Sequence, residues 1–187
     1  GVEMNECGDR ALSYLYCVES VCPECGWKVP LLPSLIVGIR AGKVVVDLVE
    51  ELQSKYYNFK IRSGVTSKDI SAAQANGTVR NNAMICPHCG KSTPISALRH
   101  DTTDENGNTV YGLRLWNVEE FEPRTDDIFT ERLYAVRYEH IDVLPNGKTK
   151  STRYYTEPGE REIKNEKKIL EIVRDKFASW QENGFVP

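Results

Sequence analysis

Hydrophobic and polar residues alternate along several short stretches of this chain, a pattern typical of half-buried β-strands. Leu12–Val18 alternates weakly and leads into a cysteine pair, and "GTVRNNAMI" from Gly77 leads into a second pair. Between them, "KVVVDLVEEL" from Lys43 and "YNFKIR" from Tyr57 are rich in β-branched and aromatic residues. We therefore expect a strand over each of these four stretches.

Two helices are predicted, one short and one long. The short helix covers "TSKDISAAQ", because Thr66 or Ser67 can cap its first turn and "ANG" ends it. The long helix runs from about Gly159 to Glu182, and Asn183-Gly184 follows as a C-cap. Its apolar residues recur at steps of three and four: Ile169, Leu170, Val173, Phe177 and Trp180. We expect this apolar stripe to pack in the core.

The sequence "RLYAVRYEHIDVLPNGKTKSTRYYTE" predicts a β-hairpin. Two alternating aromatic and β-branched runs flank Pro145-Asn146-Gly147, which is a favourable turn sequence. We expect this hairpin to pack under the long helix. The predicted fold class is therefore α+β, mostly β, with one hairpin and one long C-terminal amphipathic helix.

The composition is that of a globular protein. The chain has 187 residues, of which 40% are hydrophobic and 27% charged, so it fits one ordinary domain or two small ones. No run of about 18 apolar residues occurs, so we expect no membrane span. We expect no secretory leader, and four of the six cysteines form two CxxC pairs. These features favour a reducing, cytoplasmic location.

Charge is distributed unevenly along the chain. Residues 51–100 contain seven basic and two acidic residues, whereas residues 101–131 contain nine acidic and two basic residues. Such asymmetry could give a basic surface that contacts a polyanion. The alternative, an ordinary solvated surface, remains open.

The strongest chemical signal is a repeated Cys-Pro-x-Cys-Gly motif, in "VCPECGWKVP" and "ICPHCGKSTP". Two thiolates in one tight turn can face the same metal ion, so two such knuckles (residues 22–26 and 86–90) provide the four sulfurs of a structural zinc site. The predicted ligands are Cys22, Cys25, Cys86 and Cys89. A four-sulfur site leaves no open position for substrate, so we predict a zinc ribbon that stabilises the fold and no catalytic residue.

Thiol redox chemistry is the main alternative for these cysteines. A redox CxxC pair usually begins a helix, and neither pair here is followed by a helical pattern. We assign no role to Cys7, Cys17 or His88.

The energy of zinc binding also favours a site shared by two distant knuckles. Structural zinc contributes about 10–16 kcal/mol of binding free energy, which exceeds the entropic cost of about 3.6 kcal/mol for closing the long loop between the knuckles.

The sequence around the knuckles resembles adenine-specific DNA methylases that contain a zinc ribbon. The similar stretches are "YLYCVESVCPECGWKVPLLPSLIV", "GTVRNNAMICPHCGKSTPISALR" and the C-terminal "RYYTEPGEREIKNEKKILEIVRDKFASWQENGFVP". The resemblance as a whole covers nearly the entire chain, about Leu12 to Pro187. The family's Asp/Asn-Pro-Pro-Tyr/Phe catalytic loop and its Gly-rich methyl-donor loop do not occur in this sequence.

The resemblance implies an accessory domain, with the S-adenosylmethionine-dependent catalytic domain elsewhere in the same polypeptide. We expect a zinc-ribbon domain over residues 12–118 and a hairpin-helix sub-domain over 119–187. The accessory domain would contact double-stranded DNA or position the catalytic core. Trp27 could stack on a base or pack beside the metal. Candidate DNA contacts are the basic residues near the knuckles, Lys28, Arg80, Lys91 and Arg99. The alternative is a structural zinc-binding module that contacts a protein and no DNA.

Overall fold

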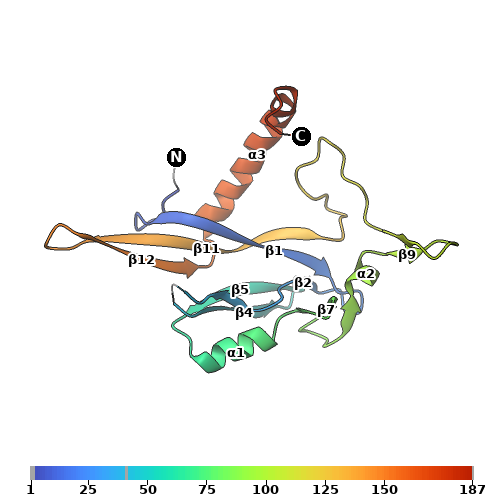
Figure 1. Ribbon diagram of the computed structural model, residues 1–187, viewed down its shortest axis with the longest axis horizontal. Helices are drawn as coiled ribbons and strands as arrows, with labels where there is room; N and C mark the ends of the chain where they lie inside the picture. Colours follow the sequence, from blue (N-terminus) through green and yellow to red (C-terminus); the bar gives the residue numbers. More distant parts are fainter. Residues whose placement is uncertain (1–2, 41, 187) are drawn as a thin grey trace.

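The computed structural model describes residues 3–40 and 42–186 and confirms the α+β fold class (Figure 1). The strands are β1 (Arg10–Val21), β2 (Lys28–Pro30), β3 (Ile36–Gly38), β4 (Val44–Glu51), β5 (Tyr56–Ser63), β6 (Val79–Arg80), β7 (Ala83–Ile85), β8 (Ser92–Pro94), β9 (Thr102–Thr103), β10 (Thr109–Val110), β11 (Thr130–Val143) and β12 (Thr149–Thr156). The helices are α1 (Ser67–Ala75), α2 (Ile95–Leu98) and α3 (Glu160–Glu182).

One seven-stranded sheet, with the order β12-β11-β1-β2-β5-β4-β3, organises the molecule. It folds over itself, so that β12, β11 and β1 lie above β5 and β4, and α1 lies beneath the lower strands (Figure 1). Strand β1 joins the two layers because it pairs with β11 along most of its length and with β2 at its end. The two segments predicted as sub-domains, 12–118 and 119–187, therefore share this sheet.

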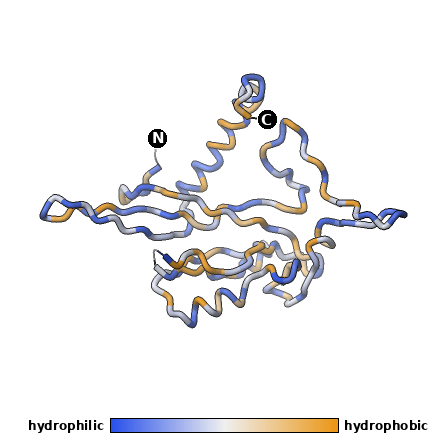
Figure 2. Tube along the Cα trace, viewed as in Figure 1, coloured by the Kyte–Doolittle hydropathy of each residue, from blue (hydrophilic) through white to orange (hydrophobic). Residues whose placement is uncertain are grey.

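Apolar side chains fill the space between the two layers. Cys17 of β1 and Val46 of β4 are both buried in one cluster, and the rings of Phe59 and Tyr134 meet with centroids 5.5 Å apart. Hydropathy along the trace is highest in the lower strands that face this interior (Figure 2). Cys17 is a core residue, and its burial raises the pKa of its thiol to about 12.

The strand predictions are confirmed for β1, β4 and β5, and the stretch from Gly77 differs. The structure divides "GTVRNNAMI" into β6 and β7, which pair as a tight hairpin. Asn81 and Asn82 form its turn with φ values of 49° and 57°. Asparagine tolerates this left-handed conformation better than most residues, so the two asparagines interrupt the expected strand. The second knuckle is thus preceded by a hairpin.

Both predicted helices and the predicted hairpin are present. Thr66 caps α1 in a reciprocal arrangement with Asp69: the Asp69 amide donates to the Thr66 hydroxyl, and the Thr66 amide donates to the Asp69 carboxylate. Strands β11 and β12 pair along eight positions, and Gly147 takes a φ of 77° in the turn between them. Helix α3 ends at Glu182, where Asn183 is its C-cap.

The expectation that the stripe of α3 packs in the core is wrong. No residue along α3 is buried, and Ile169 is 56% exposed (the whole helix lies within the described residues). The helix projects away from the sheet (Figure 1). Tyr138 of β11 donates a hydrogen bond to Glu162 in its first turn, and farther along the rings of Phe121 and Phe177 meet at 5.1 Å.

The geometry of the upper layer explains this difference. A helix of 23 residues is about 34 Å long, whereas three strands span only about 10 Å across the sheet. A helix that leaves such a narrow layer at a steep angle can cover it with its first turns only. The periodicity that predicted the helix carries no information on that angle.

Candidate metal centre

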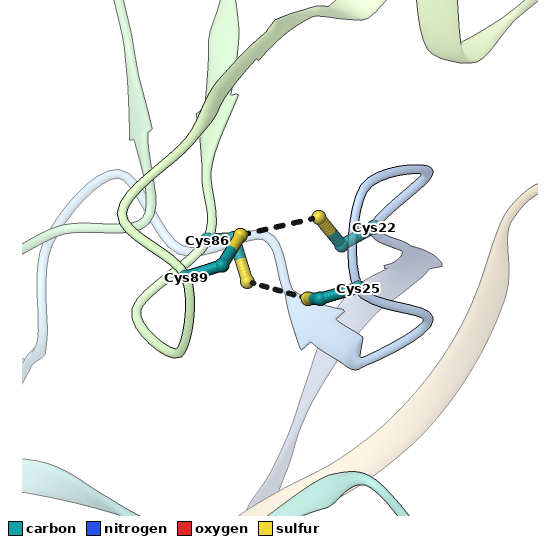
Figure 3. Close-up of side chains that lie close together, drawn as sticks. All are labelled: Cys22, Cys25, Cys86 and Cys89. Carbon is teal, nitrogen blue, oxygen red and sulfur yellow. Dashed lines mark hydrogen bonds between the residues drawn. The ribbon is translucent and has the colours of Figure 1, made fainter.

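The structure brings the sulfurs of Cys22, Cys25, Cys86 and Cys89 together, all within 4.8 Å of one another (Figure 3). Two distances that cross between the knuckles are 3.8 Å from Cys22 to Cys89 and 3.7 Å from Cys25 to Cys86. A regular tetrahedron with Zn–S bonds of about 2.3 Å has sulfur–sulfur edges of about 3.8 Å. The four cysteines therefore have the spacing to hold one metal ion.

Each knuckle reaches this geometry through the same backbone hydrogen bonds. The amide of Gly26 donates to the Cys22 carbonyl at 2.9 Å, and the amide of Gly90 donates to the Cys86 carbonyl at the same distance. Both glycines have φ near 70° (75° and 70°), a conformation in which a Cβ is unfavourable. The glycine that follows each second cysteine is therefore required by the turn.

A second pair of hydrogen bonds closes each knuckle. The Cys22 amide donates to the Trp27 carbonyl at 2.8 Å, and the Cys86 amide donates to the Lys91 carbonyl at 2.9 Å. The repeated sequence motif thus corresponds to a repeated local fold, with its two cysteines pointing the same way from each turn (Figure 3).

Burial and backbone hydrogen bonds shift the pKa values of the clustered thiols in opposite directions. Burial raises the pKa of Cys86 to about 12 and also raises that of Cys25, because both lose solvent around the thiolate. In contrast, the Lys91 amide donates to the Cys89 sulfur and lowers the pKa of that thiol. Hydrogen bonds from backbone amides therefore do not offset the effect of burial on the pKa values of Cys86 and Cys25. A bound divalent cation would hold the cysteines as thiolates.

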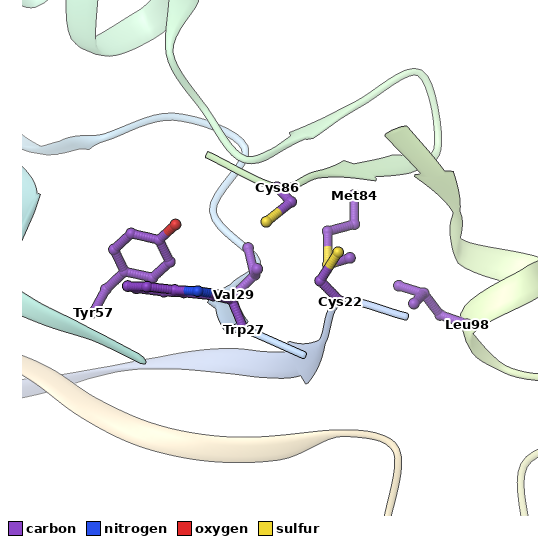
Figure 4. Close-up of a cluster of buried hydrophobic side chains, with 7 residues drawn as sticks. All are labelled: Cys22, Trp27, Val29, Tyr57, Met84, Cys86 and Leu98. Carbon is purple, nitrogen blue, oxygen red and sulfur yellow. The ribbon is translucent and has the colours of Figure 1, made fainter. Parts of the chain in front are cut away.

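A buried apolar cluster surrounds the sulfurs (Figure 4). Trp27 is only 3% exposed, and its ring stacks on His88 at 4.2 Å and contacts Tyr57 at 5.1 Å. It packs beside the cysteines and is too buried to stack on a base. His88 Nδ1 lies 3.0 Å from a carboxylate oxygen of Glu50. Among the described residues, the group that could hold a metal ion consists of the four cysteines and does not include His88.

The "GTV" sequence before the second knuckle ties the two halves of the site together. Buried Thr78 accepts a hydrogen bond from the Leu32 amide at 2.8 Å and donates one to the Pro30 carbonyl. A Cβ on Gly77 would lie 2.2 Å from the Pro33 carbonyl oxygen, so only glycine permits this close approach. The sequence resemblance included Gly77-Thr78 but did not indicate what these residues do.

The four predicted DNA-contact residues fall into two groups. Lys28 lies 3.7 Å from Glu19, and Arg99 lies 2.5 Å from Asp101, so both have acidic partners. Arg80 and Lys91 are exposed and form no ion pair within the described part of the chain.

Lys55 is a basic residue near the first knuckle that the sequence did not single out. Its Nζ lies 3.9 Å from where a Cβ on Gly26 would stand, and its carbonyl accepts from the Lys28 amide. Its φ of 52° directs the chain into this turn.

The remaining cysteines lie outside the cluster, and none of the six forms a disulfide. Cys7 is exposed and Cys17 is buried between the layers. Within residues 3–40 and 42–186, no helix has both the length and the apolar character needed to cross a membrane.

Comparison with known proteins adds no further assignment. No protein-family model, curated protein or solved structure gives a significant match to this chain.

Proposed function

We propose that the four cysteines bind one structural zinc ion and that the chain is a zinc-ribbon module. The observation that carries this proposal is the sulfur spacing of 3.7 and 3.8 Å between two knuckles of matched backbone geometry. Four thiolates suit zinc, and their burial in an apolar cluster suits a structural site. All four positions around the ion would be filled by sulfur, so the site would have no place for a substrate.

The experiment that tests zinc binding is elemental analysis of the purified protein, combined with unfolding in the presence of a chelator. One zinc per chain and a large loss of stability on chelation support the proposal. A protein that lacks stoichiometric metal, or that keeps its fold after chelation, contradicts it.

We further propose that this module serves an S-adenosylmethionine-dependent adenine-specific DNA methyltransferase, whose catalytic domain lies outside these residues. The support is the sequence resemblance around both knuckles and in the C-terminal segment. The role that fits best is contact with duplex DNA near the second knuckle. Arg80 and Lys91 support it, because both are exposed cations free of the acidic partners that Lys28 and Arg99 have.

Duplex binding at several salt concentrations tests this role. Affinity should fall by about 0.9 log units per log unit of salt for each phosphate neutralised. The double variant Arg80→Glu/Lys91→Glu should remove binding, whereas Lys167→Glu/Lys168→Glu on the exposed face of α3 should change it little. Equal losses in both double variants would indicate non-specific attraction, and no affinity at low salt would exclude DNA contact.

A second candidate function is docking of a protein partner. The observation that favours it is a groove of about 620 Å³ between the outer face of the sheet, α3 and the loop at residues 121–125. Tyr16 of β1 and Ile169 and Leu170 of α3 line it, and Tyr16 and Ile169 are largely exposed. Substitution of Ile169 by Glu would disrupt such docking and leave DNA binding unchanged, which separates the two functions.

A further inference from the structure

A pocket rich in arginine lies where the edge of the upper layer meets β3. It has a volume of about 480 Å³, within the range of about 300–1,000 Å³ typical of small-ligand sites. Its walls consist of three arginines, a tyrosine and an isoleucine: Arg40, Arg137, Arg153, Tyr155 and Ile39. Among the described residues, none that lines it is acidic.

The sheet topology explains why these residues meet. Arg137 on β11 and Tyr155 on β12 are directly opposite each other in the antiparallel register. The Tyr155 ring lies against Gly38, at the end of β3, where a Cβ would be only 2.9 Å from the ring. Because the folded sheet brings β12 over β3, Arg40 just after Gly38 reaches the same pocket as the arginines of the hairpin.

Arg137 is the residue with the clearest unused binding capacity. Its Nε is buried, and no described residue forms a hydrogen bond with it. Its guanidinium lies over the Tyr155 ring at 5.7 Å, which orients the planar group without neutralising its charge. A buried donor without an acceptor is unfavourable. An oxyanion in the pocket would bind the terminal N–H groups of the same guanidinium and so change the surroundings of Nε.

The other two arginines add charge to the same pocket. Arg40 is exposed and forms no ion pair with a described residue, whereas Arg153 contacts Glu139 at 3.2 Å. Of the three arginines, only Arg153 forms an ion pair with a described residue. Guanidinium groups present planar sets of N–H donors that match the oxygens of phosphate in pairs.

We infer that Arg40, Arg137 and Arg153 form a binding site for a phosphate group. This site is separate from the proposed metal centre and from the proposed DNA contacts: no residue that lines the pocket belongs to either set, and Figure 1 shows β12 to the left of the centre and β7 to the right. The inference does not depend on the proposed function, and it can fail or succeed independently of it.

The test is a titration of the intact chain with inorganic phosphate at constant ionic strength, followed by NMR of the arginine Nε–H groups. We expect a saturable shift of the Arg137 Nε–H signal. Arg40→Ala and Arg137→Lys should each weaken binding by about tenfold or more, because each removes bidentate donors. Arg161→Ala, an exposed arginine at the start of α3, is the matched control and should leave binding unchanged.

Two further probes identify the source of the phosphate. A 5′-phosphorylated oligonucleotide that competes at Arg137, when its 5′-hydroxyl counterpart does not, would assign the site to a nucleic-acid terminus. Competition by neither oligonucleotide, with binding of inorganic phosphate retained, would assign it to a free phosphate.

The inference is overturned if phosphate produces no saturable shift, or if Arg161→Ala weakens binding as much as Arg40→Ala. Arg40 is exposed, so Arg40→Ala should fold normally and keeps the test valid even if Arg137→Lys does not fold. The Arg80→Glu/Lys91→Glu variant should bind phosphate normally, which separates this site from the proposed DNA contacts.

Discussion

The indole of Trp27 and the imidazole of His88 are stacked, with centroids 4.2 Å apart and planes within 15° of parallel. One ring follows the first knuckle and the other lies between the two cysteines of the second. The contact therefore joins the knuckles through side chains as well as through the proposed ion. Glu50 of β4 contacts His88 at 3.0 Å and extends this connection to the lower layer.

The first prediction concerns His88. His88→Ala should lower the free energy of unfolding by about 0.5–1.5 kcal/mol, because it removes an aromatic pair. The metal content should not change, since the ligands are the four cysteines. Elemental analysis and urea denaturation measure both quantities. His88→Phe is the matched control, as it keeps a ring over Trp27 and should recover part of the lost stability. Loss of metal from His88→Ala would instead identify His88 as a ligand.

The second prediction concerns the ligands themselves. Cys86→Ser should abolish stoichiometric zinc and leave the region between the knuckles unfolded, because binding worth about 10–16 kcal/mol exceeds the stability of most domains. Circular dichroism and metal analysis of the variant check this. The control is Cys7→Ser, since Cys7 is exposed and outside the cluster. If Cys86→Ser bound zinc as tightly as the unmodified chain, the four-sulfur site would be wrong.

The third prediction concerns Thr78. Thr78→Val keeps the shape of the side chain but leaves the Leu32 amide and the Pro30 carbonyl without a side-chain partner. The expected cost is about 1–3 kcal/mol of unfolding free energy, measured by urea denaturation. Thr102→Val, at an exposed position in β9, should cost far less. Similar losses at the two positions would mean that Thr78 does not hold the halves of the site together.

The sequence predicted those parts of this structure that depend on local pattern. Strand β1, the Thr66 cap and the hairpin turn at Gly147 all follow from alternation, capping and turn preferences within a few residues. That Cys22, Cys25, Cys86 and Cys89 lie together was expected from a repeated motif whose chemistry requires four ligands. Local rules were sufficient for the strand, the cap and the turn, whereas the cysteine cluster was expected from ligand chemistry.

The features that the sequence did not indicate depend on how distant elements meet. The exposure of Ile169 results from the angle at which α3 leaves the sheet, and the meeting of Arg40 with Arg137 results from the sheet folding over itself. The Asn81-Asn82 turn did have a local signal, because adjacent asparagines favour left-handed turns. The β-branched and apolar residues around them favoured a continuous strand.

The last prediction concerns pH and the attachment of the N-terminal segment. Buried Asp9 accepts hydrogen bonds from Tyr154 and from His140 Nδ1, and His140 Nε2 lies 3.0 Å from Asp142. Both ring nitrogens of His140 can donate only when the imidazole is protonated. The hydrogen bond to Asp9 accordingly raises the pKa of His140 above its usual 6.5, and the Tyr154 hydroxyl, followed by His140, lowers the pKa of Asp9 below its usual 3.8.

The direction of the pH effect follows from these two shifts. The stabilisation from His140 is complete below pH 6.5 and is lost as pH rises through the raised pKa of the imidazole. The stabilisation from Asp9 is complete above pH 3.8 and is lost as pH falls through the lowered pKa of the carboxyl group. Residues 3–9 should therefore be held most firmly between pH 3.8 and 6.5, and their attachment should weaken toward alkaline pH.

NMR titration of the His140 ring measures the raised pKa of the imidazole. In the Asp9→Asn variant, the pKa of His140 should return toward 6.5. An unchanged pKa in Asp9→Asn would show that Asp9 does not hold the proton on His140, and the pH dependence would then need another origin.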